Sequence, residues 1–200
     1  MWGSKILSKT EGNDKYLFDF KKQWVEGYAE VIKAAAKLYD LPEYLIAGVV
    51  YSEVGGDPLW IDDVAYFVRD NIPKGMRNKI PGGKNPDLTS YGNVSIQVEV
   101  ATRTLGYNLE NLTDSQRRII IKSIKDPVQN ILISAKHLSE LRDIDFKGKI
   151  SSHLTIDDVK VIATRYNRGP NLSIDKIRDN MSYGTFITKR KSLLGDMLNE

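Results

Sequence analysis

Apolar residues recur at helical spacing along much of the chain. From Tyr16 to Tyr39 they fall about 3.6 residues apart, which predicts one amphipathic helix over this range. A last amphipathic helix is expected from about Thr185 to Met197. Between them, helix starts with a capping signal stand at Thr113-Asp114-Ser115-Gln116, Asp126-Pro127 and Thr155-Ile156-Asp157-Asp158. The pattern predicts a mostly α fold with about seven or eight helices and little strand.

A short apolar run, residues 45–50, is bracketed by helix signals. Pro42 suits the first helical position and Gly55-Gly56 is a strong stop, so we expect a buried helix from about Pro42 to Val54. Glu53 would then lie in the last turn, where the negative end of the helix dipole and an apolar surround both disfavour ionisation. A carboxyl group held protonated in this way can donate a proton near neutral pH. The alternative is a solvated glutamate at a helix end.

Two stretches depart from the helical pattern. Residues 1–14 are polar and turn-rich, and we expect them to form a flexible arm ahead of a single domain, residues 15–200. Residues 72–89 are rich in Pro and Gly and also carry four basic side chains, Lys74, Arg77, Lys79 and Lys84. That composition predicts a loop or irregular hairpin inserted into the domain. Such an insertion is either functional or simply a solvated basic loop.

The charge of the chain is nearly balanced. Its 29 basic and 26 acidic residues give a formal net charge of +3, which is too weak to indicate nucleic-acid binding. Because the chain has no cysteine, disulfides and thiolate metal sites are excluded. His137 and His153 have no Cys or second His at metal-ligand spacing, and we interpret both as ordinary surface or partly buried residues. No metal or organic cofactor is expected.

Four separated segments stand out together. They are Tyr51-Ser52-Glu53, Thr89-Ser90-Tyr91-Gly92-Asn93-Val94-Ser95-Ile96-Gln97-Val98, Asp126-Pro127-Val128-Gln129-Asn130-Ile131 and Ala163-Thr164-Arg165-Tyr166-Asn167-Arg168-Gly169-Pro170. Their order and spacing resemble the lysozyme-like superfamily, in its lytic transglycosylase and goose-type lysozyme branch. That family has a catalytic Glu closing a helix, a Gly-rich turn before Leu-Met-Gln, a helix opened by Asp-Pro, and an Ala-Tyr-Asn-Ala-Gly segment. The likeness covers about residues 41–190 and implies a helical domain with a cleft.

The resemblance assigns roles residue by residue. Glu53 matches the catalytic acid, and Gln97 matches the Gln of the Leu-Met-Gln segment. Tyr166 and Asn167 match the Tyr-Asn pair that lies near the catalytic Glu in the family. The turn that lines the cleft supplies further substrate-binding candidates, namely Ser90, Tyr91, Gly92 and Ser95. From its residue type alone, Tyr91 either stacks on a sugar face or packs internally.

Two positions depart from the pattern of the family. Val94 stands where the family has Gly, and Arg168 stands where it has Ala. These changes put the shape of the cleft in question more than its chemistry. Arg165 and Arg168, together with Arg69, are interpreted either as groove residues for an anionic polymer or as partners of Asp62 and Asp63.

The activity that the resemblance implies is cleavage of peptidoglycan at the β-1,4 bond between N-acetylmuramic acid and N-acetylglucosamine. Glu53 would protonate the leaving oxygen and then act as general base. A second carboxylate roughly 6.5–9.5 Å away would activate water. Asp62 and Asp63 are best placed for that role by sequence, although the pair equally suits a helix N-cap. Without such a carboxylate, an acetamido or hydroxyl group of the substrate would attack. The alternative function is a non-catalytic lysozyme-like module that binds glycan or another protein.

The implied substrate lies outside the cytoplasm, in the periplasm or cell wall. Residues 1–9 lack the apolar core of a classical secretory signal, so we expect a mature form or a specialised secretion route, such as that of an antibacterial effector or a phage-derived enzyme. An immunity or inhibitor protein that plugs the cleft is the partner expected for a toxin. No run approaches the roughly 18 apolar residues of a membrane span, so no membrane insertion is expected.

Overall fold

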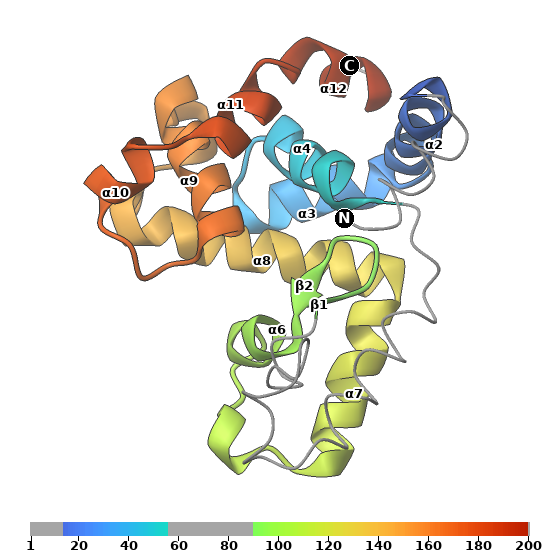
Figure 1. The fold of residues 1–200 in the computed structure, drawn as a ribbon, viewed down its shortest axis with the longest axis vertical. Coiled ribbons are helices and arrows are strands. Elements are labelled where there is room, and N and C mark those ends of the chain that lie inside the picture. Colours follow the sequence, from blue (N-terminus) through green and yellow to red (C-terminus); the bar gives the residue numbers. More distant parts are fainter. Residues whose placement is uncertain (1–13, 56–89, 200) are drawn as a thin grey trace.

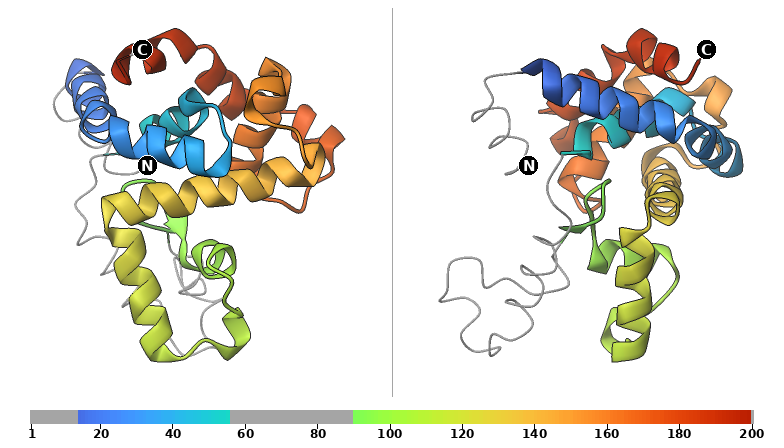
Figure 2. Two further views of the ribbon diagram at one scale, coloured as in Figure 1. Left: turned by 180° about the vertical axis from the view of Figure 1, so that it is seen from behind. Right: turned by 90° about the vertical axis from the view of Figure 1, so that its right-hand side faces the viewer.

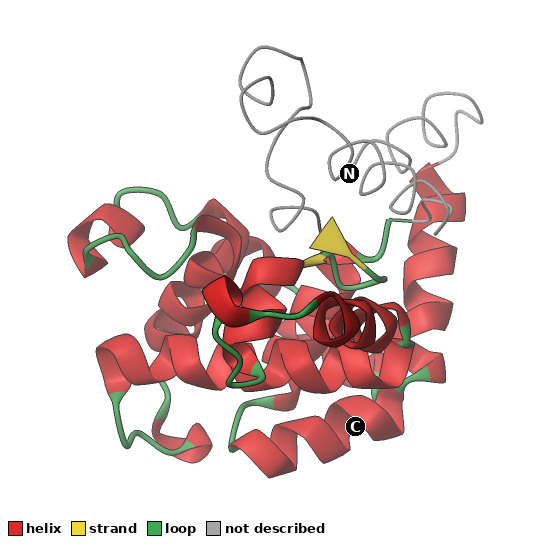
Figure 3. Cartoon of the chain, turned by 90° about the horizontal axis from the view of Figure 1, so that it is seen from below, coloured by secondary structure: helices red, strands yellow, loops and turns green. Residues whose placement is uncertain are grey.

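The computed structural model describes residues 14–55 and 90–199. Asp62, Asp63, Arg69 and the basic 72–89 segment lie outside the described residues, as does the expected arm up to residue 13. The described part of the chain is mostly helical, with ten α-helices, two 3-10 helices and one two-stranded sheet (Figure 1; Figure 3).

In chain order the elements are α2 (Asp14–Gly27), α3 (Ala29–Tyr39), α4 (Glu43–Glu53), β1 (Ser90–Tyr91), β2 (Ile96–Gln97), α6 (Val98–Thr104), η3 (Leu109–Asn111), α7 (Asp114–Lys125), α8 (Pro127–Phe146), η4 (Ser151–His153), α9 (Ile156–Arg168), α10 (Ile174–Arg178), α11 (Ser182–Thr188) and α12 (Lys191–Met197).

The single helix expected from Tyr16 to Tyr39 is two helices, α2 and α3, separated at Tyr28. Tyr28 has φ −112° and ψ 16°, outside helical values, and it follows Gly27, a residue of low helix propensity. The Tyr28 backbone N–H donates to both the Trp24 and Val25 carbonyls, so the chain bends without losing its hydrogen bonds. The hydrophobic period continues through such a bend, which is why the sequence pattern does not mark it.

The capping signals predict local structure well. Thr113 and Thr155 each form a complete capping box at the start of α7 and α9. Asp126 caps α8 by accepting from the Gln129 N–H, with Pro127 at the first helical position. By contrast, the expected last helix is two short ones, α11 and α12, separated at Lys189 and Arg190.

Helix α8 runs through the middle of the molecule and contributes to two hydrophobic clusters (Figure 1; Figure 2). Its Ile131 and Leu138 belong to the larger cluster, formed with α2, α3, α4, α9, α11 and α12. Its Ile133 belongs to the smaller cluster, formed with the β1–β2 hairpin, α6 and α7. In the antiparallel hairpin Ser90 pairs with Gln97 and Tyr91 with Ile96. The end of α4 and the hairpin thus come from the two sides of α8.

Candidate active site

Helix α4 is buried along most of its length and ends at Glu53. Residues 45–51 are all buried, so this helix has no solvent face along that run. Pro42 is the N-cap and Glu43 the first helical residue, one position later than expected. Glu53 itself is only partly buried, and its carboxyl group reaches a cleft beside the helix end.

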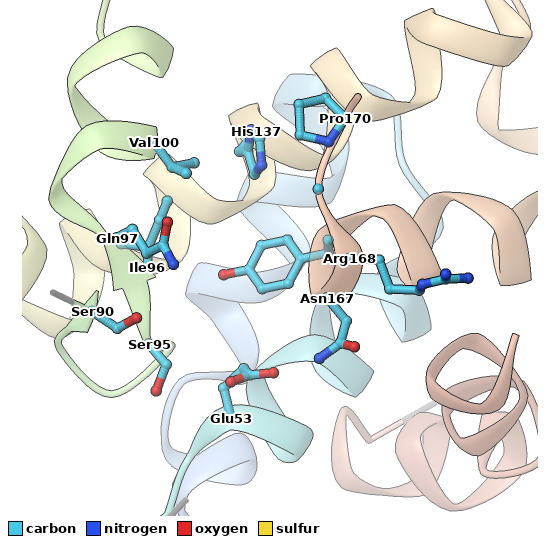
Figure 4. Close-up of a pocket in the computed structure, with 12 residues that line it drawn as sticks. Glu53, Ser90, Ser95, Ile96, Gln97, Val100, His137, Asn167, Arg168 and Pro170 are labelled. Carbon is cyan, nitrogen blue, oxygen red and sulfur yellow. The ribbon is translucent and has the colours of Figure 1, made fainter. Parts of the chain in front are cut away.

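The cleft has a volume of about 490 Å³ and lies between the β1–β2 hairpin, α8 and the end of α9 (Figure 4). The described residues that line it are Glu53, Ser90, Ser95, Ile96, Gln97, Val100, His137, Tyr166, Asn167, Arg168, Gly169 and Pro170. Six of these are the catalytic or substrate-binding candidates Glu53, Ser90, Ser95, Gln97, Tyr166 and Asn167, and Arg168 is a seventh residue that the sequence singled out. They come from segments more than 100 residues apart, and the fold brings them together around one carboxyl group.

Tyr91 and Gly92 lie away from the cleft wall. The Tyr91 side chain is 1% exposed and packs in the smaller hydrophobic cluster, so its ring cannot stack on a ligand in the cleft. Gly92 has φ +75°, and a Cβ atom there would lie 1.9 Å from the Ile124 carbonyl oxygen. Both residues therefore fix the hairpin against α7 and α8, and neither contacts the cleft volume.

Glu53 is hydrogen-bonded to a residue that the sequence pattern did not single out. The Tyr183 hydroxyl, on α11, donates to Glu53 Oε1 at 2.7 Å. Burial raises the pKa of Glu53, and the Tyr183 hydrogen bond and the charge of Lys21 partly offset that rise. Burial, together with the Glu53 charge, also raises the pKa of Tyr183 well above its usual value, so the phenol stays a donor.

Two glycines let α11 approach closely enough to place Tyr183. At Gly184 a Cβ atom would lie 2.2 Å from the Lys160 carbonyl oxygen on α9. At Gly48, on α4, it would lie 2.3 Å from Ile187 Cγ2 on α11. The Gly184 N–H also donates to Thr164 Oγ1 at 3.3 Å. A side chain at Gly184 would clash with the backbone of α9, and one at Gly48 would displace the Ile187 side chain. The two glycines therefore allow α11, which carries Tyr183, to pack closely against α9 and α4.

Lys21 satisfies the carbonyl end of α4. Its ammonium donates to the Tyr51 carbonyl at 2.8 Å and to the Ser52 carbonyl at 3.1 Å. Cations stabilise helix C-termini, where the last carbonyls have no partner within the helix. Burial lowers the pKa of Lys21 to about 8, although the nearby Glu53 charge favours the ammonium form. Lys21 therefore places a positive charge near the Glu53 carboxyl group, in addition to the Tyr183 hydrogen bond.

Tyr166 lines the cleft, and its hydroxyl is engaged by the hairpin. It donates to the Val94 carbonyl at 3.0 Å and lies 3.2 Å from Ser134 Oγ. The Val94 N–H in turn donates to Asn130 Oδ1 at 2.8 Å. The Val94 side chain is buried and is not among the residues that line the cleft, so it does not narrow the cleft. Tyr166 shapes the wall and ties α9 to the hairpin.

Arg165 is a buried structural residue, which overturns its interpretation as a groove residue. Its side chain is 1% exposed and pairs with Asp145, through a bond of 2.9 Å from Nη2 to Oδ1 and a second from Nε. Its Nη1 donates to the carbonyls of Pro170 and Leu172. Arg165 thereby holds the loop whose Gly169 and Pro170 form one wall of the cleft.

Arg168, the other departure from the family pattern, lines the cleft and is exposed. Its Nη1 donates to the Lys176 carbonyl, on α10, at 2.7 Å. Figure 4 shows its guanidinium pointing away from Glu53.

The described residues that line the cleft offer one carboxylate and several hydrogen-bonding groups. No group of three or more metal-ligating side chains occurs in residues 14–55 and 90–199. In the same residues, none of the helices has the length and apolar character needed to cross a membrane. The arrangement can supply a proton from Glu53 and can orient a bound molecule through Asn167, Gln97 and the two serines.

Comparison with protein-family models, with curated proteins and with solved structures finds no match for this chain. A functional assignment therefore depends on the residues of the cleft and on their geometry.

Proposed function

We propose that the chain is a lysozyme-like enzyme that cleaves peptidoglycan glycan strands, a muramidase or a lytic transglycosylase. The observation that carries the proposal is the partly buried Glu53, whose raised pKa suits a proton donor and whose carboxyl group lines a polar cleft. Cleavage of a glycosidic bond requires protonation of a poorly basic leaving oxygen while positive charge builds on the sugar ring. A carboxyl group that remains protonated near neutral pH meets that requirement.

In the proposed reaction, Glu53 donates its proton to the glycosidic oxygen as the C–O bond breaks, and the leaving sugar departs with a new hydroxyl group. Glu53 is then a carboxylate, stabilised by the Tyr183 hydroxyl and by the charge of Lys21. It next accepts a proton from the nucleophile that attacks the sugar cation, which returns Glu53 to its starting state. Tyr183 and Lys21, which limit the rise of the Glu53 pKa, thus also stabilise the carboxylate that acts as general base in the second step.

The nucleophile of the second half of the cycle is water or a group of the substrate. Glu53 is the sole carboxylate among the described residues that line the cleft. Asp62 and Asp63, the candidates for a water-activating carboxylate, lie outside the described residues. Their role therefore stays a prediction from the sequence. Attack by water gives a reducing sugar, whereas attack by the C6 hydroxyl of the muramyl unit gives a 1,6-anhydro sugar.

The polar side chains beside Glu53 suit recognition of the substrate. Asn167 and Gln97 are exposed, and Figure 4 shows the Asn167 amide extending toward Glu53. An amide can both donate to and accept from the acetamido and hydroxyl groups of an amino sugar. Tyr166, whose hydroxyl donates to the hairpin, is better suited to a wall that the sugar packs against.

The proposal is tested with purified cell-wall sacculi. Wild type is expected to lower the turbidity of the suspension, and Glu53→Gln, which keeps the shape but not the proton, is expected to lose that activity. Glu43→Gln is the matched control, because it makes the same change at the other end of α4. Loss of turbidity with Glu53→Gln, or none with wild type across a wide pH range, would exclude this mechanism. The second result would favour the non-catalytic glycan- or protein-binding module.

Mass spectrometry of the released muropeptides distinguishes the two nucleophiles, since the hydrolysed and anhydro products differ by one water. An enzyme of this kind acts on the cell wall, in the periplasm or outside the cell. An immunity or inhibitor protein would block it by filling the same cleft.

A further inference from the structure

His137 lies in the wall of the cleft, and the proposed reaction does not use it. It projects from α8, its side chain is 13% exposed, and its ring lies 5.8 Å from the Tyr166 ring at an angle of 55°. Figure 4 places His137, Val100 and Pro170 at the opposite end of the cleft from Glu53. An imidazole and two apolar surfaces therefore face the same volume.

One nitrogen of the His137 ring faces an anionic side chain. His137 Nδ1 lies 3.4 Å from Thr104 Oγ1 and 3.6 Å from Glu140 Oε2. Glu140 is held in place by Thr104, whose hydroxyl donates to Oε2 at 3.0 Å, and by an ion pair with Lys136. Although burial raises the pKa of Glu140, hydrogen bonds from His137, Lys136 and Thr104 lower it to about 2, so this carboxylate is ionised.

The ionised carboxylate determines which tautomer of the imidazole is favoured. An anion beside Nδ1 favours the tautomer that carries its proton there, because that N–H points to the negative oxygen. In the neutral ring the other nitrogen, Nε2, is then a hydrogen-bond acceptor. Thr104 and Glu140, which face Nδ1, are not among the residues that line the cleft, whereas Val100 and Pro170 are. Nε2, on the other side of the ring, is therefore the nitrogen that can accept a hydrogen bond from a molecule in the cleft.

We propose that His137, Val100 and Pro170 form a binding site for the N-acetyl group of a hexosamine unit at the far end of the cleft from Glu53. The acetamido N–H donates to His137 Nε2, and the acetyl methyl group packs against Val100 and Pro170. This inference rests on the proposed function for the identity of the substrate, and it adds a residue that selects acetylated over deacetylated sugars.

The site is tested by direct binding, with cleavage removed. In the Glu53→Gln background, we measure the Kd of a soluble N-acetylglucosamine oligomer and of the matching deacetylated oligomer by calorimetry. His137→Phe fills the same space without an acceptor and is expected to weaken binding of the acetylated oligomer by about five- to tenfold, the effect of one lost hydrogen bond. Binding of the deacetylated oligomer is expected to be weak and unchanged.

Two further variants make the result specific. His137→Gln retains an acceptor near the position of Nε2 and is expected to recover most of the lost affinity. His153→Phe makes the same change at the other histidine, which is exposed on η4 and outside the cleft lining, and should leave both affinities unchanged. Circular dichroism melts of each variant establish that it is folded. If His137→Phe does not fold, saturation-transfer NMR of the acetyl methyl protons in the parent decides the question.

Equal affinity of the parent and His137→Phe for the acetylated oligomer would overturn the inference. So would an equal loss of affinity for both oligomers, or the absence of saturation transfer to the acetyl methyl group. The turbidity assay with wild type is independent of these results. If wild type leaves sacculi intact while His137→Phe loses acetyl-specific binding, the proposed enzyme activity is refuted and the binding site is supported. If wild type degrades sacculi while His137→Phe binds the acetylated oligomer like the parent, only the binding site is refuted.

Discussion

The hydrogen bond between Tyr183 and Glu53 makes a quantitative prediction for Tyr183→Phe. The phenol donates to Glu53 Oε1 at 2.7 Å, and this contact lowers the pKa of a carboxyl group that burial raises. Removing the hydroxyl removes a stabiliser of the ionised form, so the pKa of Glu53 rises further. Proton donation requires the protonated form, which is lost as the pH rises through that pKa. The alkaline limb of the activity profile is therefore expected to move to higher pH.

The size of this displacement follows from the strength of the bond in each protonation state. A hydrogen bond to an ionised group contributes about 1.5–3 kcal/mol, and one between neutral groups contributes about 0.5–1.5 kcal/mol. The difference, about 1–1.5 kcal/mol, corresponds to about one pH unit, because 1.36 kcal/mol shifts a pKa by one. The contact joins two partly buried side chains, so solvent screening removes only part of it.

The assay is the initial rate of turbidity loss from sacculi at constant ionic strength over a series of pH values. Titration of the Glu53 carboxyl carbon by heteronuclear NMR gives the same pKa without relying on activity. Tyr107→Phe is the control, since that tyrosine is 44% exposed and outside the cleft lining. An alkaline limb that stays in place or moves to lower pH in Tyr183→Phe would show that this hydroxyl does not stabilise the ionised carboxylate.

Two further variants test the neighbours of the site. Lys21→Met removes the cation near Glu53, so the alkaline limb of the activity profile should again move to higher pH. Lys21→Arg keeps the charge and should move the alkaline limb less. Lys22→Met, on the exposed side of α2, is the control and should leave the alkaline limb in place. Gly184→Ala places a methyl group against the Lys160 backbone and is expected to lower the free energy of unfolding by about 1–3 kcal/mol, measured by urea denaturation. Gly27→Ala is its control, because a Cβ atom there meets nothing within 4 Å, and equal stability of the two variants would mean that α11 is not held at this distance.

The sequence predicts the parts of this fold that depend on neighbouring residues. The caps at Thr113, Asp126 and Thr155 involve side chains and backbone groups within one turn, so the chain pattern is enough to place them. The position of Glu53 at a helix end follows from the apolar run before it and the glycines after it. The bend at Tyr28 and the break near Arg190 do not interrupt the hydrophobic period. The pattern therefore predicted one helix in place of α2 and α3, and one in place of α11 and α12.

The parts of the site that the sequence did not reveal depend on packing between distant elements. Tyr183 lies just before the apolar stripe from which the last helix was inferred, so nothing local links it to Glu53, 130 residues away. Lys21 falls on the polar face of an amphipathic helix, where lysine is ordinary. His137 has a local partner, Glu140, three residues along α8, but its second partner, Thr104, comes from α6 and is 33 residues away in the chain. Gly48, within an apolar helix, was the one sequence signal that another element packs closely against α4, and that element is α11.

Tyr166 and Tyr183 have different hydrogen-bond partners, and the motif alone does not predict which of them contacts Glu53. The resemblance pairs Tyr166 with the catalytic carboxyl group, yet the Tyr166 hydroxyl donates to the Val94 carbonyl and the hydrogen bond to Glu53 comes from Tyr183. A tyrosine that holds the hairpin fixes the shape of the cleft, and one that donates to the carboxylate sets how readily the proton leaves. The first role depends on α9 and the hairpin, and the second depends on α11. Loss of either tyrosine should therefore have different signatures: Tyr166→Phe in substrate affinity, and Tyr183→Phe in the pH profile.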